Sequence, residues 1–377
     1  MKTGLYIHIP FCLRKCLYCA FYSVPARSPE QAGDYKEALL REAAYFKERH
    51  FAGARERIGT LYVGGGTPSL LPVSFYSELF DGLQASFDFS CLEEVTFEAN
   101  PEHLSLPYLH DLYLYTPARR LSIGLQSFSE ADLKFLNRRH DARQAVEAVE
   151  NARKAGFENI SVDLIYGLHP EDSVSTWQEN LKCLRDLHLP HFSAYALTVE
   201  PGTMLERKLA SGGLQVAGEE QVEREYFQLQ DFAAGNGYEA YEISNYARDG
   251  AYALHNRNYW RDVPYVGLGA SAHSYLAGER HWNPSSVQAY MDDPVAGKQG
   301  EKLSERDRYH EYVMTALRTI WGVEESRIEA FSPALREEFR LRAGQEVAQG
   351  NLLHGKGTYV VPSSKRLLTD GIATAFF

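Results

Sequence analysis

The sequence predicts an α/β protein, with a partial (β/α)6 TIM-like barrel followed by a smaller C-terminal α+β domain. Short, mostly apolar β-rich runs alternate with longer helical patterns between residues 5 and 198, as in parallel βαβ units. Six such runs are too few for a closed eight-stranded barrel, so we expect an open one. The alternation ends near residue 217, and a chain of 377 residues has room for a second, smaller domain.

The six predicted strands are rich in β-branched and aromatic residues. They occupy residues 5–9, 60–64, 94–99, 120–126, 160–167 and 192–198. The clearest helical patterns between them cover residues 34–49, 141–156 and 175–188. We therefore assign residues 1–217 to the barrel.

The remainder of the chain divides into two predicted parts. Residues 218–300 begin with a helical pattern and continue into a region rich in Tyr, Trp and His, which we interpret as an extension of the barrel. Residues 301–377 contain helical patterns at 306–320 and 333–350, then a hairpin-like stretch at 352–372. This order suggests a small winged-helix-like domain.

Composition narrows the classes of function. Hydrophobic residues make up 44% of the chain, enough for a substantial core, and no long charge-free apolar run predicts a membrane span. The formal net charge of -11 does not favour nucleic acid as a partner. We see no secretory signal and expect a cytoplasmic protein, where clustered cysteines are metal ligands or redox groups more often than disulfides.

Three of the five cysteines, Cys12, Cys16 and Cys19, form a C-x3-C-x2-C motif directly after the first predicted strand. Zinc in a structural site normally takes four ligands, usually from two separate CxxC pairs, and a second pair is missing. A redox CxxC at Cys16 and Cys19 fits poorly beside a barrel strand. Cys91 and Cys183 stand alone, and we expect both to be small buried hydrophobic side chains.

Three thiolates suit a [4Fe–4S] cluster in which one iron atom lacks a protein ligand. Such clusters usually have four cysteine ligands, so a missing fourth cysteine leaves a coordination site open to a small molecule. A zinc-binding structural protein is the alternative, and the presence of iron and sulfide in the purified protein would exclude it.

Polar or glycine residues follow each of the other predicted strands, at the rim where barrel enzymes place their sites. They include the run Gly64-Gly65-Gly66-Thr67, then Glu98, Gln126, Arg138, Asp163, and Tyr195 with Ala196. The glycines permit either close approach to a ligand or a tight turn. Convergence of six strand ends favours one shared site.

The motifs YIHIPFC, GGGTP, FEANP, GLQSF and DLIYGL resemble one branch of the radical SAM superfamily, over nearly the whole chain. The branch contains the oxygen-independent coproporphyrinogen III oxidases (HemN) and the related HemW heme chaperones. The resemblance implies a [4Fe–4S] cluster on Cys12, Cys16 and Cys19, with S-adenosylmethionine on the open iron. It implies cofactor-binding roles for Tyr6, Gly65, Gly66, Thr67, Glu98, Gln126, Arg138, Asp163, Ala196 and His273.

Two features favour the chaperones over the oxidases. The oxidases carry a further cysteine two positions after the motif, where this chain has Phe21. The stretch HNRNYW, which begins at His255, resembles an HNxxYW motif of the chaperones and implies that His255 binds heme. The expected cofactors are therefore the cluster, S-adenosylmethionine and heme, and the expected partners are a heme-acceptor protein and an electron donor.

The alternative function is oxidative decarboxylation of coproporphyrinogen III, started by a 5'-deoxyadenosyl radical. The structural alternative for His255 is a loop histidine beside aromatic core residues, and for His8 a structural role next to the cluster. Leu17, Ala20, Asn137 and Arg139 depart from the residues that the family resemblance leads us to expect.

Overall fold

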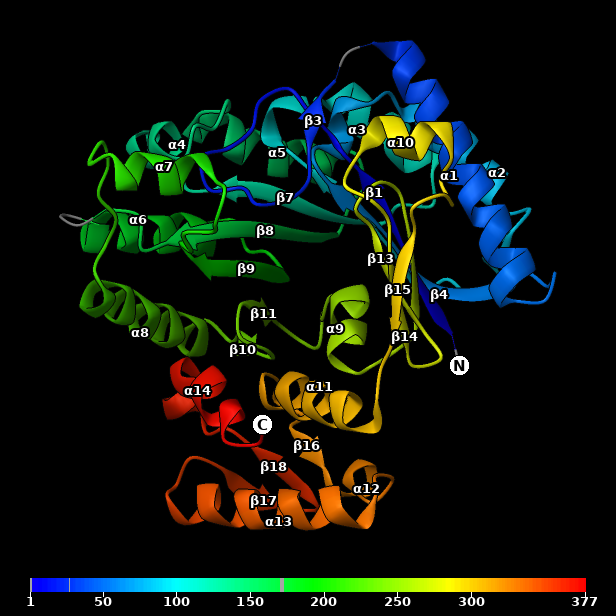
Figure 1. Ribbon diagram of the computed structural model, residues 1–377. Helices are drawn as coiled ribbons and strands as arrows, with labels where there is room; N and C mark the ends of the chain where they lie inside the picture. The colour runs from blue at the N-terminus through cyan, green and yellow to red at the C-terminus, as the bar shows by residue number, and fades with distance from the viewer. Residues whose placement is uncertain (1, 27, 170–172) are drawn as a thin grey trace.

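The computed structural model describes residues 2–26, 28–169 and 173–377. Six parallel strands lie side by side in chain order and form the wall of an open barrel (Figure 1). They are β1 (Thr3–Ile9), β4 (Glu56–Gly65), β6 (Glu94–Ala99), β7 (Arg120–Gln126), β8 (Asn159–Tyr166) and β9 (His191–Ala196). Each overlaps a predicted strand, so the predicted fold class is confirmed.

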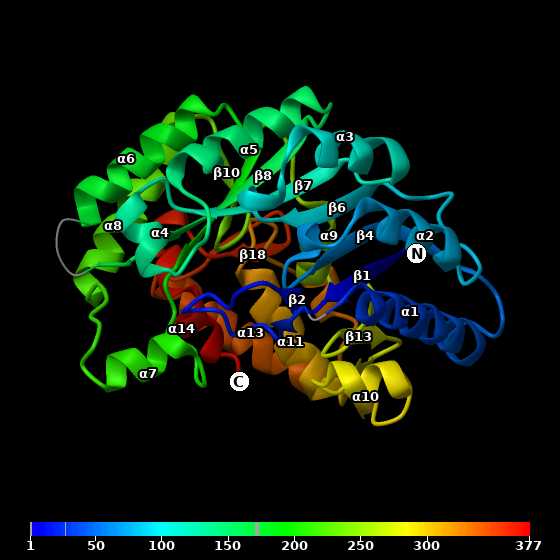
Figure 2. The same cartoon turned by 90° about the horizontal axis from the view of Figure 1, so that it is seen from above.

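Helices cover the outer face of this sheet, as the view from above shows (Figure 2). They are α1 (Pro29–His50), α2 (Val73–Leu83), α3 (Leu106–Tyr115), α4 (Glu130–Phe135), α5 (Ala142–Lys154), α6 (Ser173–Asp186) and α8 (Glu219–Gly235), with short α7 (Met204–Ala210) beside the rim. Local signals begin several of them. The Asp141 side chain accepts a hydrogen bond from the Gln144 N–H, and the Asp141 N–H donates to the Gln144 side-chain oxygen, a capping box that fixes the start of α5.

Both edges of the parallel sheet continue into further strands. On one side β12 (Tyr265–Leu268) runs parallel to β1, and β13 (His273–Leu276), β14 (Glu279–Trp282) and β15 (Gln299–Lys302) follow antiparallel. On the other side β11 (Asn245–Ala247) and β10 (Glu239–Ala240) follow β9 antiparallel. None of the six predicted strands corresponds to β12, so its pairing with β1 was not predicted.

The shorter elements connect the barrel. They are β2 (Phe11–Cys12), β3 (Val24–Pro25), η1 (Pro68–Leu70), β5 (Phe87–Asp88), η2 (Pro101–His103), α9 (Leu254–Trp260) and α10 (Val287–Asp292). None of the helices in the described ranges is both long and apolar enough to cross a bilayer.

The last part of the chain has a hydrophobic core of its own, which includes Tyr309, Val313, Phe339 and Phe376. Its elements are α11 (Glu305–Leu317), β16 (Val323–Glu324), α12 (Glu325–Ile328), α13 (Pro333–Ala348), β17 (Leu353–Gly355), β18 (Thr358–Val360), η3 (Ser363–Leu368) and α14 (Thr369–Thr374). The predicted hairpin is present at β17 and β18. Residues 363–374 are helical, however, so the hairpin-like interpretation of the whole stretch 352–372 is wrong in its second half.

A layer of buried polar side chains crosses the barrel interior at the amino ends of β6, β7 and β9. Arg120, only 2% exposed, lies 4.0 Å from the Glu94 carboxylate and 3.5 Å from Nδ1 of His191. Glu94 also accepts hydrogen bonds from the backbone N–H groups of Leu254 (2.8 Å) and His255 (2.9 Å). Its negative charge therefore stabilises the first turn of α9, whose orphan N–H groups point at it.

Candidate cluster and cofactor site

The cysteine motif forms a loop that leaves β1 and closes over the carboxyl ends of the strands. Backbone bonds fix the loop from two sides: Gly66 N–H donates to Ile9 O and Thr67 N–H to Phe11 O, both at 2.8 Å. Leu17 N–H donates to Leu136 O at 3.3 Å, and Leu17 O accepts from Leu205 N–H at 2.9 Å. Cys12, Cys16 and Cys19 are half-buried and line one cavity of about 540 Å³.

Two hydrogen-bond donors point at the cysteine sulfur atoms. Thr67 Oγ1 lies 3.4 Å from Cys12 Sγ, and Arg138 Nη1 lies 3.4 Å from Cys16 Sγ. Burial raises the pKa of the Cys12 thiol, and raises the pKa of Cys19 to about 11. Bound iron would supply the positive charge that holds these buried thiolates in the ionised form, and the hydrogen bonds from Thr67 and Arg138 would tune the reduction potential of the cluster.

This donor set fits a [4Fe–4S] cluster. Within the described ranges, no three His, Cys, Asp or Glu side chains converge closely enough to hold a single metal ion. In a cubane cluster each cysteine binds a different iron atom, so the three sulfur atoms need not converge on one point. In the described chain, the cavity wall beyond these three residues contains no further cysteine, which suits a cluster with one iron atom open to a small molecule.

The glycines after β4 are required by the packing of the loop. Gly65 has φ +112°, and a Cβ there would lie 2.5 Å from Nδ1 of His8. A Cβ on Gly66 would lie 2.8 Å from the carbonyl oxygen of Phe11. Both glycines and Thr67 also line the cavity, so the tight turn and the close approach to a ligand are compatible.

Glu98 lies in the same wall, at the end of β6. It accepts hydrogen bonds from the Tyr62 hydroxyl (2.6 Å) and the Gly65 N–H (3.0 Å). Burial raises the pKa of the Glu98 carboxyl group to about 7, against the hydrogen bond from Tyr62, which lowers it. The carboxylate becomes the favoured form when a cation binds beside it.

This pKa gives a testable pH dependence. If the ammonium group of S-adenosylmethionine binds Glu98, affinity of the cluster-loaded protein should rise about fivefold from about pH 6 to about pH 7.5, as Glu98 ionises and before the α-ammonium group, with an ordinary pKa of about 8, loses its proton. Equilibrium dialysis under anaerobic conditions measures this. Glu98→Gln should bind weakly with no such dependence, and a flat profile in the wild type would exclude Glu98 as the ammonium partner.

Arg138 is held in the cavity by a turn that Asn137 makes possible. Asn137 adopts φ +62°, a conformation that asparagine tolerates, and its side chain donates to Lys15 O at 3.1 Å. Arg138 donates to Asn100 Oδ1 (2.8 Å) and Gly124 O (2.6 Å). Asn137, which departs from the residue that the family resemblance leads us to expect, therefore ties this turn to the cysteine loop.

The structure brings most of the predicted cofactor residues to one cavity. Its wall includes Gly65, Gly66, Thr67, Glu98, Gln126, Arg138, Asp163 and Ala196. Gln126 ends β7 with φ +72°. Burial raises the pKa of Asp163, which accepts from Ser122 Oγ at 3.5 Å.

Two predicted cofactor residues lie outside this wall. The Tyr6 hydroxyl is hydrogen-bonded to Nδ1 of His8 at 2.9 Å, and the Tyr6 ring packs against Tyr62. His273 is exposed at the start of β13, with its ring stacked on Trp282 at 6.0 Å between centroids. His8 is buried and its Nε2 lies 3.0 Å from Tyr22 O, a loop-holding contact.

The predicted heme ligand, His255, is buried and hydrogen-bonded, whereas the two isolated cysteines are only half-buried. His255 is 1% exposed, with Nδ1 2.9 Å from Thr60 Oγ1 and Nε2 2.9 Å from the Tyr259 hydroxyl. Burial lowers the pKa of His255 to about 3, so the ring is neutral. Cys91 and Cys183 are half-buried, more open to solvent than expected for core residues.

Sequence reasoning missed Tyr62 and Asn100, which orient Glu98 and Arg138. The alternation of β4 places Tyr62 on the same side as Thr60 and Gly64, and Asn100 is two residues beyond Glu98. Both signals were present in the strand pattern.

Known proteins resemble the chain over half to nearly all of its length. Residues 6–191 match the model of the Radical SAM superfamily. The heme chaperone HemW of Lactococcus lactis subsp. lactis (strain IL1403) is 34% identical over 349 residues, covering 92% of this chain and 89% of that protein. The heme chaperone HemW of Escherichia coli (strain K12) is 30% identical over 378 residues, covering 99% and 97%.

A solved structure shares the fold. The coproporphyrinogen III oxidase HemN from Escherichia coli, described as a radical SAM enzyme, superposes with a TM-score of 0.84 at 24% identity, over 100% of this chain and 90% of that chain. The sequence relatives identify the branch more closely than this likeness in fold. The chain belongs to the HemW family of radical SAM proteins.

Proposed function

We propose that the chain binds a [4Fe–4S] cluster through Cys12, Cys16 and Cys19, binds S-adenosylmethionine in the adjoining cavity, and carries heme to an acceptor protein. The observation that supports this most is the single cavity that joins the three cysteines to Glu98 and Arg138. Heme is proposed as the cargo because the HemW relatives are named heme chaperones.

The chain's own residues account for cofactor binding in this proposal. Glu98 accepts hydrogen bonds from the ammonium group of S-adenosylmethionine or from its ribose, and Arg138 supports the sulfur of Cys16 while offering donors to a carboxylate. A reduced cluster supplies an electron. Thiolates of this kind persist in a reducing compartment such as the cytoplasm, and an electron donor is the corresponding partner.

The oxidase remains the second candidate, favoured by the likeness in fold to HemN. Phe21, 69% exposed, lines the mouth of the cavity at the position where the oxidases have cysteine. We expect the cluster-loaded chain, given S-adenosylmethionine and a reductant, to form no protoporphyrinogen IX from coproporphyrinogen III. HemN of Escherichia coli is the positive control, and sustained product formation by this chain would favour the oxidase.

The heme ligand remains a proposal that needs a change of conformation. Both nitrogens of His255 are hydrogen-bonded, so ligation through Nε2 requires the bond to Tyr259 to break. We expect His255→Ala to lose the spectrum of histidine-ligated heme, whereas Tyr259→Phe, which removes the competing hydroxyl, keeps it. Absorption spectra of the heme-loaded variants test this.

Two results would contradict ligation by His255. One is an unchanged heme spectrum in His255→Ala. The other is a wild-type spectrum typical of tyrosinate-ligated heme that disappears in Tyr259→Phe, which would place the ligand at the tyrosine.

A further inference from the structure

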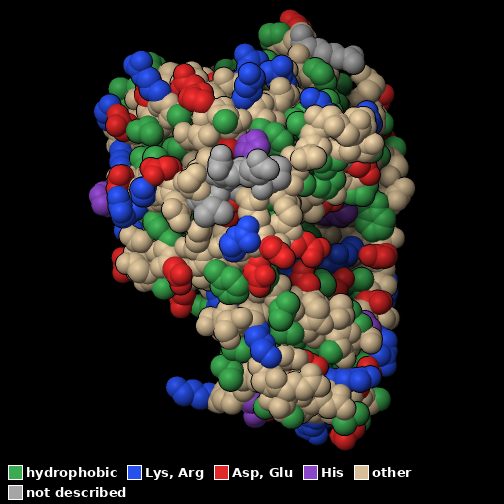
Figure 3. Space-filling view, turned by 90° about the vertical axis from the view of Figure 1, so that its left-hand side faces the viewer, with side chains coloured by type: hydrophobic (Ala, Val, Ile, Leu, Met, Phe, Trp, Pro, Cys, Tyr) green, Lys and Arg blue, Asp and Glu red, His purple; other side chains and the backbone are tan. Residues whose placement is uncertain are grey.

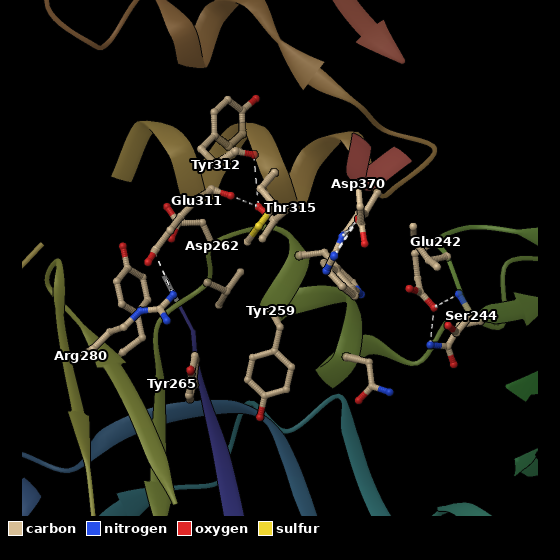
Figure 4. A pocket seen from close by; sticks show the side chains of 18 of the residues that line it. Glu242, Ser244, Tyr259, Asp262, Tyr265, Arg280, Glu311, Tyr312, Thr315 and Asp370 are labelled. Atoms are coloured by element: carbon tan, nitrogen blue, oxygen red, sulfur yellow. Dashed lines mark hydrogen bonds and ion pairs between the residues drawn. The ribbon is translucent and has the colours of Figure 1, made fainter. Parts of the chain in front are cut away.

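A second cavity, of about 720 Å³, lies between the barrel and the last part of the chain, residues 305–374, which we call the C-terminal unit. Figure 4 shows Tyr312 and Thr315 of α11 above it, Tyr259 of α9 and Tyr265 of β12 below it, and Arg280 of β14 at one side. We call this cavity the interdomain cleft. Its volume is within the range of about 300–1,000 Å³ that small-molecule and cofactor sites occupy.

Aromatic rings form much of the wall of the interdomain cleft. The ring centroid of Tyr265 lies 4.7 Å from that of Tyr259, in an edge-to-face arrangement, and 6.4 Å from that of Tyr275. Trp260, Tyr195 and Tyr312 complete the aromatic lining. Rings that present faces and edges to a cavity bind a flat conjugated molecule well, since they offer large apolar area with little loss of side-chain entropy.

The charges in the interdomain cleft restrict the ligand further. Two guanidinium groups line it, and each is paired: Arg280 with Glu311 at 2.9 Å, and Arg318 with Asp370 at 2.7 Å. The lining contains two more carboxylates, on Glu242 and Asp262, so it is net acidic and disfavours a polyphosphate.

A ligand with few carboxylates can still use these arginines. Partly exposed ion pairs are weak, and a guanidinium group has five N–H donors, so Arg280 can turn to a ligand carboxylate or share its donors with it. On the outer surface, the face in Figure 3 also carries acidic and basic side chains side by side. Acidic side chains gather where the molecule narrows above the C-terminal unit.

The interdomain cleft is next to the cluster and cofactor cavity. Tyr195 and Asn256 line both cavities and form a shared wall. His255 lies outside the lining of the interdomain cleft, whereas Tyr259, its hydrogen-bond partner, belongs to that lining. A ligand stacked against Tyr259 would contact His255 only after the Tyr259 side chain moves, because His255 is 1% exposed and its Nε2 lies behind the Tyr259 hydroxyl.

We infer that the interdomain cleft is the tetrapyrrole site, with the macrocycle stacked between the aromatic walls and a propionate paired with Arg280. The inference rests on the proposed heme function and adds the location and the binding residues. Heme in the cleft leaves the adjoining cavity to the cluster and S-adenosylmethionine.

A bulky residue in the cleft tests the location. Thr315 lines the cleft, and its hydroxyl bonds only to carbonyl groups of its own helix, Glu311 and Tyr312, so Thr315→Trp fills the space without removing a tertiary bond among those described. We expect heme binding by Thr315→Trp to weaken by about tenfold or more, with iron content and S-adenosylmethionine binding unchanged. Leu341→Trp, on the exposed face of α13, is the matched control and should bind heme as the wild type does.

A second pair of variants tests the carboxylate contact. Arg280→Gln should weaken heme binding by about tenfold, since a charge-assisted hydrogen bond is lost. Arg306→Gln, which breaks a comparable exposed pair with Glu338 away from the cleft, should not. Circular dichroism and iron content show whether each variant is folded and loaded.

The outcomes separate this inference from the proposed function. If the wild type binds heme and both Thr315→Trp and Arg280→Gln bind it equally well, heme binds elsewhere and the inference is wrong. If the wild type itself binds no heme, the proposed function fails first.

Discussion

Alanine at Cys16 is expected to abolish assembly of the iron–sulfur cluster. Three cysteines line the cavity, and Cys16 additionally accepts a hydrogen bond from Arg138 at 3.4 Å. With two thiolates left, two iron atoms lack a protein ligand, and the cluster should not survive gel filtration. Iron and sulfide per chain after anaerobic reconstitution measure this, together with the visible absorbance of the cluster.

Cys91→Ala and Cys183→Ala are the matched controls for this experiment. Both cysteines are half-buried thiols outside the cavity, so both variants should take up as much iron and sulfide as the wild type. Full iron and sulfide in Cys16→Ala would contradict the assigned ligand set. Equal losses in all three variants would indicate non-specific damage rather than loss of a ligand.

Arg120→Met should destabilise the protein by about 3–5 kcal/mol, the cost of breaking a buried ion pair by removing one partner. Methionine fills part of the space but leaves the buried Glu94 carboxylate without its cation at 4.0 Å. Loosening of Glu94 also weakens the start of α9, because Glu94 accepts from Leu254 and His255 N–H. Denaturant unfolding of the cluster-free protein gives the free energy of unfolding.

Arg119→Met is the neighbouring control. Arg119 is exposed, donates to Thr116 O and Ala118 O, and lies over the Tyr113 ring, so its loss should cost clearly less than that of Arg120. Glu94→Gln in the Arg120→Met background should recover part of the loss, since no buried charge then remains unpaired. Equal stability of Arg120→Met and the wild type would contradict a structural role for this ion pair.

The six barrel strands were predictable because short runs rich in β-branched, apolar and aromatic residues alternate with longer helical patterns, as in residues 60–64. The position of β12 was not. Its residues 265–268 pair with β1, more than 250 residues earlier in the chain, and no local pattern reports a partner so distant. The helical end of the chain at residues 363–374 was missed because Pro362 and the serines after it resemble a turn.

The cofactor cavity was largely predictable because parallel strands deliver their carboxyl ends to one rim. Glu98 and Arg138 were found in this way, and the three cysteines by their spacing. The surroundings of His255 could not be predicted, since they depend on Thr60 of β4 and on Glu94 of β6, which are distant in sequence. The family motif therefore includes a residue that holds α9 against the sheet in this conformation.

The most direct test of the central claim is an anaerobic heme titration of the wild-type protein carrying its cluster, followed by absorption. We expect saturable binding of one heme per chain, with the cluster intact and the heme recovered unchanged after release. Absence of saturable binding, or only the non-specific association that an unrelated protein also shows, would contradict a heme-carrying role for this chain.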